Sequence, residues 1–178
     1  LTGLNKIWGL GLTLRELMTL GEQLGSDVPF CLMEGTALAR GRGEKLESLP
    51  PCTSLGLVLV KPPFGVSTAS VYRAYSPGKL EKRPHCRNMV EAIESRDPGA
   101  IARRLYNALE TVTFAMHPEV AAIKEKLLEA GALGALMSGS GPTVFGLTRN
   151  LQDARTVAGR YRKLGREQVL ITQTWNSA

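Results

Sequence analysis

A segment rich in glycine and serine joins two short apolar stretches in the C-terminal part of the sequence. Its members are Ser138, Gly139, Ser140 and Gly141. Glycine allows backbone conformations in which successive N–H groups point into one concavity, and such concavities bind anions. The same residues suit an ordinary hairpin turn, because the segment has neither the lysine nor the following helix of a Walker loop. On these residues alone, an anion site and a plain turn both stay open.

Asp27 stands in a segment, residues 26–29, that we expect to form a loop directly after a helix. Pro29 follows closely, and proline restricts the backbone before it, which helps to fix such a loop. A carboxylate held in this way could orient or deprotonate a hydroxyl group. Aspartate also caps turns and pairs with arginine in cores, so the residue type is equally typical of a structural role.

Thr68 and Tyr72 lie one helical turn apart, after a segment that ends in Gly65. If a helix begins near Thr68, the hydroxyl and the aromatic ring share one face and could line one cleft. A helix cap and a core tyrosine would explain the same two residues. The histidines, His85 and His117, lie far from any pair of Cys or carboxylate residues at metal-ligand spacing, so we assign no metal site.

The elements that must position these residues follow a recognisable order in the last two-thirds of the chain. Apolar patterns predict strands at 55–60, 135–137, 143–147 and 168–172, a long helical region at about 68–130, and a helix at 151–163. The order is βαββαβ, the ferredoxin-like split βαβ arrangement, and the expected fold class is therefore α+β.

The first third of the chain has a different pattern. Residues 1–8 have the spacing of a helix tail, and Thr13 with Glu16 forms a capping box that begins a helix ending at Gly25. Residues 35–40 and 44–49 flank a glycine-rich turn and predict a hairpin. The segment 50–54 is typical of a linker, so we expect one domain at 1–53 and another at 54–178.

The composition narrows the class of protein. The 178 residues are 43% hydrophobic and 21% charged, as in globular proteins, and no apolar run is long enough to span a membrane. The net charge of +6 comes from two basic stretches, 79–87 and 155–166, without the interleaved aromatics of RNA-binding proteins. We therefore expect neither nucleic acid nor membrane as a partner. Three cysteines without C-x-x-C pairing, and no signal peptide, favour the cytoplasm.

Four segments in order, residues 4–12, 25–30, 35–44 and 137–145, resemble the GHMP family of small-molecule kinases. The resemblance implies a ferredoxin-like C-terminal kinase domain preceded by the remnant of the N-terminal, ATP-binding domain. The family's long glycine- and serine-rich ATP loop has no counterpart here. We therefore expect the chain to be a C-terminal portion of such an enzyme, with little activity by itself.

The resemblance also implies chemistry. The segment 25–30 is most similar to family members that use ATP, with Mg²⁺, to phosphorylate the 2-hydroxyl of a cytidine diphosphate-linked methylerythritol in non-mevalonate isoprenoid biosynthesis. Asp27 corresponds to the catalytic aspartate, residues 138–141 to the loop near the ATP phosphates, Thr68 to a substrate-binding threonine, and Tyr72 to the ring stacked on cytosine. Two alternatives remain, a family member acting on homoserine or mevalonate and a basic RNA-binding ferredoxin-like module.

Overall fold

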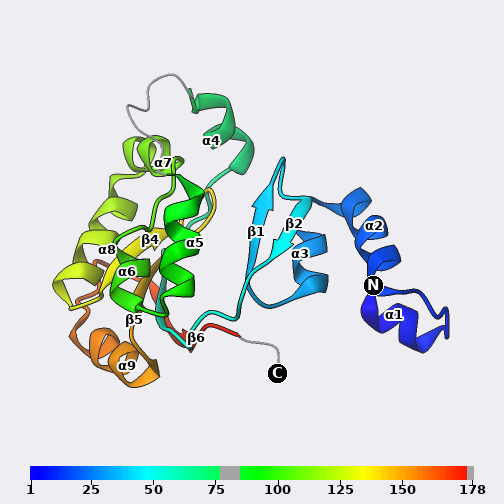
Figure 1. The fold of residues 1–178 in the computed structure, drawn as a ribbon. Helices are drawn as coiled ribbons and strands as arrows, with labels where there is room; N and C mark the ends of the chain where they lie inside the picture. Colours follow the sequence, from blue (N-terminus) through cyan, green and yellow to red (C-terminus); the bar gives the residue numbers. More distant parts are fainter. Residues whose placement is uncertain (77–84, 176–178) are drawn as a thin grey trace. The chain divides into compact units, whose positions relative to one another are not determined.

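The computed structural model describes residues 1–76 and 85–175 (Figure 1). The basic stretch at 79–87 therefore lies mostly outside the described residues. The chain divides into two compact units, the first made of Leu1–Cys52 with Trp175 and the second of Thr53–Thr174. The assignment of residues 1–53 and 54–178 to two kinase domains stays a prediction, and each unit is described by itself.

The second unit is built on a four-stranded antiparallel sheet. Its strands are β3 (Gly56–Lys61), β4 (Gly134–Met137), β5 (Val144–Thr148) and β6 (Gln168–Gln173). They lie side by side in the order β4-β5-β3-β6, so the first strand of the unit separates the third from the fourth. This is the split βαβ arrangement, and the predicted α+β, ferredoxin-like class is confirmed.

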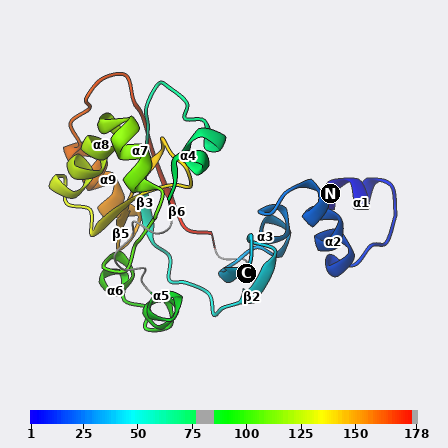
Figure 2. The same ribbon diagram turned by 90° about the horizontal axis from the view of Figure 1, so that it is seen from above.

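Two helices cover one face of this sheet. Helix α8 (Pro118–Glu129) packs on β4 and β5, and α9 (Leu151–Arg160) packs on β3, β5 and β6. In Figure 2 the strands β3, β5 and β6 lie between α8 and α9 on one side and α5 and α6 on the other. The core under α8 and α9 contains Val58, Val60, Val120, Ile123, Leu127, Ala130, Ala135, Met137, Val144, Ala154, Val157 and Tyr161.

The cap predicted for α9 is confirmed, since Asn150 accepts a hydrogen bond from the backbone N–H of Asp153. The end predicted for this helix at residue 163 is wrong. The helix stops at Arg160, and Tyr161 continues in an extended conformation with its ring in the core. The apolar spacing of Tyr161 and Leu164 is typical of a helix. In the structure, the ring of Tyr161 reaches the core from extended backbone after the helix has ended.

The helical region predicted at about 68–130 consists of several helices. Its described residues form five separate helices: α4 (Thr68–Ala74), α5 (Cys86–Glu94), α6 (Pro98–Ala102), α7 (Glu110–Met116) and α8. Pro98 and Pro118 each stand in the first turn of a helix, where a missing N–H costs nothing. Asp97 caps α6 by accepting from the N–H of Gly99. These start signals divide the region.

The first unit contains α1 (Thr2–Ile7), α2 (Leu14–Leu24), α3 (Val28–Met33) and a hairpin of β1 (Ala37–Arg40) with β2 (Lys45–Ser48). The capping box of α2 is present as predicted, because Glu16 accepts from the N–H of Thr13 at 2.8 Å and Thr13 accepts from that of Glu16 at 3.3 Å. The bond from the Thr13 backbone holds the pKa of the Glu16 carboxyl below its usual value.

The expected loop at 26–29 is wrong, since α3 begins at Val28.

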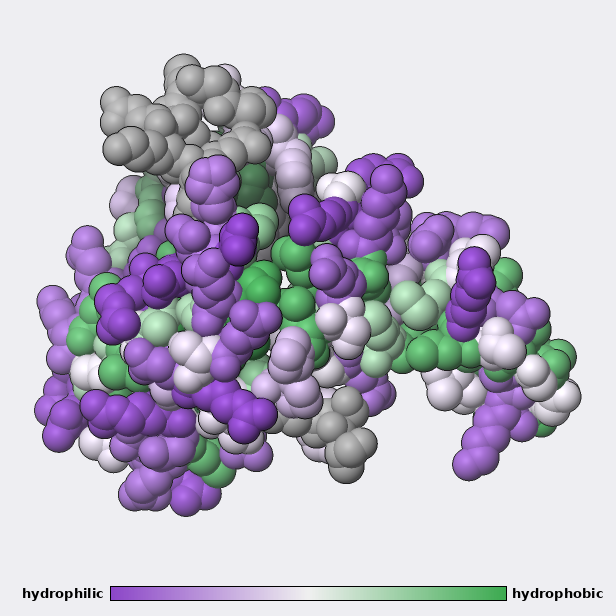
Figure 3. Space-filling view, viewed as in Figure 1, coloured by the Kyte–Doolittle hydropathy of each residue, from purple (hydrophilic) through white to green (hydrophobic). Residues whose placement is uncertain are grey.

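The two units differ in how well they bury apolar side chains. In the first unit only Leu17, Gly21 and Pro29 are buried among the described residues. Large apolar side chains are exposed instead, including Ile7 at 78%, Leu24 at 70% and Trp8 at 64%. Figure 3 shows hydrophobic residues at the surface over α1 and α2. The second unit holds nearly all of the core.

None of the helices in the described residues combines the length and the apolar composition needed to cross a membrane.

Candidate functional site

The glycine- and serine-rich segment forms the loop between β4 and β5. Gly139 and Gly141 have positive φ angles of 56° and 86°. At Gly141 a Cβ atom would lie 2.7 Å from the Met137 sulfur, so this position also needs glycine for space. The loop is closed by hydrogen bonds from the N–H of Ser138 to Thr143 O at 2.8 Å and from the N–H of Gly141 to Ser138 O at 2.9 Å.

These bonds leave two amides available. Within the described residues, the backbone N–H groups of Gly139 and Ser140 donate to no protein acceptor. Gly139 is exposed, and a Cβ added to it would meet nothing within 4 Å. Two neighbouring free amides in open space are what a phosphate oxygen needs, and the residues therefore fit the phosphate groups of a nucleotide.

Thr68 lies against this loop. Its hydroxyl is 2.8 Å from the hydroxyl of Ser140, a contact that joins residues far apart in the sequence. The cap of α4 is Ser67, which accepts from the N–H of Ser70, so the cap alternative for Thr68 is wrong. Tyr72, one turn further along α4, is 60% exposed and is not a core tyrosine. Both side chains are thus available at the surface of the second unit.

Three residues that the sequence interpretation missed hold the loop from the side of α7. Asn107 donates through Nδ2 to the carbonyls of Met137 at 2.8 Å and Gly139 at 2.7 Å. Thr113, which is fully buried, donates to Ser140 O at 3.2 Å, and Glu110 Oε1 accepts from the N–H of Met137 at 2.9 Å. Their only signal in the sequence is a polar residue at every third position of a stretch that also contains the polar Thr111.

Asp27 is at the other end of the chain, in the first unit. It occupies the N-cap position of α3, yet its side chain makes no capping bond. Among the described residues it also has no ion pair and no hydrogen bond to its carboxylate. Neither structural alternative for Asp27, a capped turn or a pair with a core arginine, is realised. The catalytic role that the resemblance implies for Asp27 stays a prediction.

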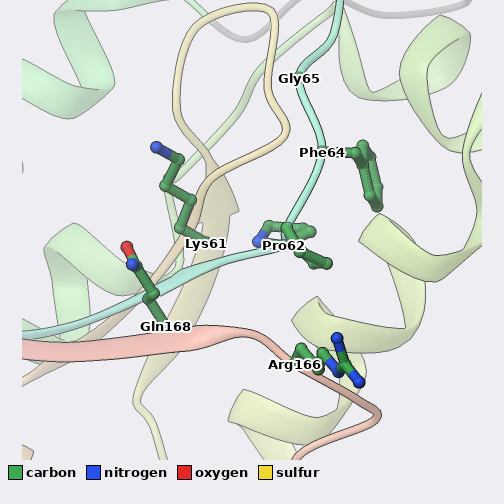
Figure 4. A pocket seen from close by; sticks show the side chains of 7 residues that line it. Lys61, Pro62, Phe64, Gly65, Arg166 and Gln168 are labelled. Atoms are coloured by element: carbon green, nitrogen blue, oxygen red, sulfur yellow. The ribbon is translucent and has the colours of Figure 1, made fainter.

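A hollow of about 370 Å³ lies in the second unit where β3 leads into residues 62–65 (Figure 4). Lys61 on β3 and Gln168 on β6 are neighbours in the sheet and line it, together with Arg166 and Phe64. Phe64 in turn stacks on His117, with ring centroids 5.3 Å apart. Neither Lys61 nor Arg166 forms an ion pair within the part of the chain that the structure describes, so the lining is positively charged.

No cluster of three or more His, Cys, Asp or Glu side chains that could hold a metal ion occurs in residues 1–76 and 85–175. The chemistry that the described groups support is therefore binding of an anion by backbone amides and hydroxyls, and acceptance of a proton or hydrogen bond by an unpaired carboxylate.

Residues 89–167, which lie within the second unit, match the family described as GHMP kinases C terminal. Individual relatives carry the name of one particular kinase. A 4-diphosphocytidyl-2-C-methyl-D-erythritol kinase of Pelotomaculum thermopropionicum is 64% identical over 176 residues, covering 99% of this chain and 61% of the relative. A kinase of the same name from Exiguobacterium sibiricum is 49% identical, covering 96% of this chain and 59% of the relative.

Solved structures agree with this similarity. A crystal structure of 4-(cytidine 5'-diphospho)-2C-methyl-D-erythritol kinase is 30% identical, with a TM-score of 0.78, and the match covers 98% of this chain and 62% of that one. A homoserine kinase from Cytophaga hutchinsonii has a TM-score of 0.77 at 20% identity, which shows the shared fold alone. The chain spans about three fifths of the length of these proteins. The resemblance to GHMP kinases is confirmed.

Proposed function

We propose that the chain is part of an ATP-dependent kinase that phosphorylates the 2-hydroxyl of 4-diphosphocytidyl-2-C-methyl-D-erythritol. The observation that carries the proposal is the 2.8 Å contact between the hydroxyls of Thr68 and Ser140. It joins the segment expected to bind the alcohol substrate to the loop whose free amides suit a phosphate. The identity of 64% to a kinase of that name supports the choice of substrate.

The loop's role follows from the charge that develops during phosphoryl transfer. The transferred group passes through a loose transition state with negative charge spread over its oxygens, so catalysis consists mainly of positioning and charge stabilisation. In this proposal the N–H groups of Gly139 and Ser140 donate to phosphate oxygens of ATP. ATP supplies the phosphoryl group, and Mg²⁺ would accompany its phosphates.

The acceptor side uses Asp27, Thr68 and Tyr72. The carboxylate of Asp27 orients the 2-hydroxyl and accepts its proton, a role for which an unpaired, exposed carboxylate is suited. The ring of Tyr72, 60% exposed, provides a platform for the cytosine base. Thr68, whose hydroxyl is bonded to that of Ser140, contacts the substrate from the first turn of α4.

A hybrid enzyme tests the proposal. The 176 matched residues of the Pelotomaculum kinase are replaced by this chain, and the product is assayed with ATP and 4-diphosphocytidyl-2-C-methyl-D-erythritol, homoserine or mevalonate. We expect phosphorylation of the first substrate, and little turnover by this chain alone because it lacks a counterpart of the family's long ATP loop. A folded hybrid that prefers homoserine or mevalonate, or that turns over no substrate, would overturn the proposal.

A further inference from the structure

Met137 ends the edge strand β4, and its backbone groups are bonded by side chains rather than by another strand. Its N–H donates to Glu110 Oε1 at 2.9 Å, and its carbonyl accepts from Asn107 Nδ2 at 2.8 Å. Met137 is 1% exposed, so neither group could turn to water without cost. Asn107 and Glu110 therefore close the edge of the sheet at the point where the glycine loop begins.

Glu110 is itself held on both oxygens. Its Oε2 atom lies 2.6 Å from Lys124 Nζ on α8, and the two side chains are 13% and 26% exposed. The ammonium group also lies 5.7 Å from the centroid of the Phe114 ring. A charge-assisted bond in such a sheltered place is stronger than one at the surface. The ion pair with Lys124 thus fixes the carboxylate in the position from which it accepts the hydrogen bond of the Met137 N–H.

Asn107 and Thr113, which flank Glu110 in the sequence, fix the carbonyls further along the loop. Asn107 Nδ2 donates to Gly139 O at 2.7 Å, while Asn107 Oδ1 accepts from the N–H of Leu109 at 2.9 Å. Thr113 donates to Ser140 O at 3.2 Å. The carbonyl of Gly139 and the N–H of Ser140 belong to one planar trans peptide and point in opposite directions. Holding the carbonyl toward Asn107 therefore turns the N–H of Ser140 away from Asn107, and this N–H donates to no acceptor among the described residues.

We propose that Asn107 and Glu110, with Lys124 behind Glu110, are positioning residues that keep the amides of Gly139 and Ser140 turned toward an incoming phosphate. The proposal rests on the proposed function of this loop and adds the residues that set its conformation. Asn107, Glu110 and Thr113 repeat at every third position, so one face of α7 and the turn before it supplies all four bonds.

The test follows the backbone amides of this chain by nuclear magnetic resonance, with inorganic pyrophosphate as the probe. In the wild-type chain we expect pyrophosphate to shift the Gly139 and Ser140 amide resonances. In Asn107→Ala and Glu110→Ala we expect the dissociation constant read from these shifts to rise about tenfold, as when an amide loses its preorganised direction. Without pyrophosphate, the Met137 amide should exchange with solvent about tenfold faster in Glu110→Ala.

Two further variants separate positioning from folding. Glu110→Gln keeps an acceptor for the Met137 N–H but loses the ion pair with Lys124, so its affinity should lie between those of wild type and Glu110→Ala. Glu125→Ala is the matched control, because Glu125 is an exposed glutamate on α8 without an ion pair among the described residues. We expect its affinity to stay within about twofold of wild type.

The outcomes distinguish this inference from the proposed function. Folded Asn107→Ala and Glu110→Gln chains that bind pyrophosphate as well as wild type would overturn the positioning role, even if the hybrid enzyme is active. A lower melting temperature with unchanged pyrophosphate affinity would assign these residues to stability alone. A wild-type loop that ignores pyrophosphate overturns the inference as well. A loop that binds pyrophosphate and responds to these variants supports it, even if the hybrid phosphorylates no alcohol.

Discussion

The glycine loop and Asp27 are held in opposite ways. In the loop, the carbonyls of Met137, Gly139 and Ser140 are bonded by side chains from the α7 segment, which leaves two amides free. Asp27 has a carboxylate without a bonding partner among the described residues, on a helix that it does not cap. The loop is thus a site that its own unit has already organised. The carboxylate of Asp27 makes no bond among the described residues that would stabilise its unit.

We expect the largest effect on the stability of the glycine loop from a substitution at Gly141. Gly141→Ala places a Cβ atom 2.7 Å from the Met137 sulfur at a φ of 86°, and we expect a loss of about 2–4 kcal/mol in the free energy of unfolding. Gly139→Ala is the matched control, since its φ is 56° but its surroundings are open. It should cost about 1 kcal/mol. Urea denaturation measures both, and equal losses would contradict the tight packing of the loop.

The next largest effect concerns binding on the acceptor side. In the hybrid enzyme, Tyr72→Ala should weaken binding of the cytidine substrate by about 1–3 kcal/mol, the usual range for loss of an aromatic stack on a base. Tyr72→Phe should change it little, because the ring remains. Calorimetric titration of both variants decides the point, and equal damage from the two would indicate a role for the hydroxyl instead.

Tyr161 provides a contrast to Asp27, because it is a buried polar group without a partner. Within the described residues its hydroxyl makes no hydrogen bond, and burial, with a smaller contribution from the charge of Glu167, raises its pKa to about 12. The unfolded chain releases this proton near pH 10, so the free energy of unfolding should fall as the pH rises from about 10 to about 12.

Tyr161→Phe removes both the unpaired hydroxyl and this titration. We expect the variant to gain about 1 kcal/mol at neutral pH, since the ring packs as before and no buried polar atom is left unpaired. Its unfolding free energy should also lack the additional alkaline loss of wild type. Thermal unfolding of both proteins across neutral and alkaline pH measures the difference, and parallel profiles above pH ~10 would contradict the raised pKa.

A smaller effect is expected at the contact between Thr68 and Ser140. Both side chains are at the surface, so Thr68→Val should lower the free energy of unfolding by only about 0.5–1 kcal/mol. A double-mutant cycle with Ser140→Ala measures the coupling between the two hydroxyls. A coupling near zero would mean that the substrate segment and the loop are independent.

The sequence predicts the framework well and the support of the loop poorly. The continuous apolar run of β3 indicates a strand directly, and its alternate residues are buried in the core. The roles of Asn107 and Glu110 arise only when β4 brings Met137 against the α7 segment, a contact between residues 27 or more positions apart. No local pattern encodes that contact.

The loop expected at residues 26–29 is wrong for a different, local reason. A proline after an aspartate is common in loops, but Pro29 stands in the first turn of α3, where proline is also favoured. Sequence signals therefore identify Asp27 as a candidate by resemblance, while its lack of bonds could be found only in the structure. Its catalytic role stays a prediction.

The most direct test of the central claim is Asp27→Asn, for which stability and turnover should separate. The free energy of unfolding of this chain should change by less than about 0.5 kcal/mol, because the carboxylate makes no bond to the described residues that the substitution could break. In the hybrid enzyme, kcat should fall by ~10²–10⁴-fold while KM changes little, as when a positioned base is lost. Wild-type turnover together with a stability loss of about 1 kcal/mol would show that Asp27 is a structural residue, and would contradict the account.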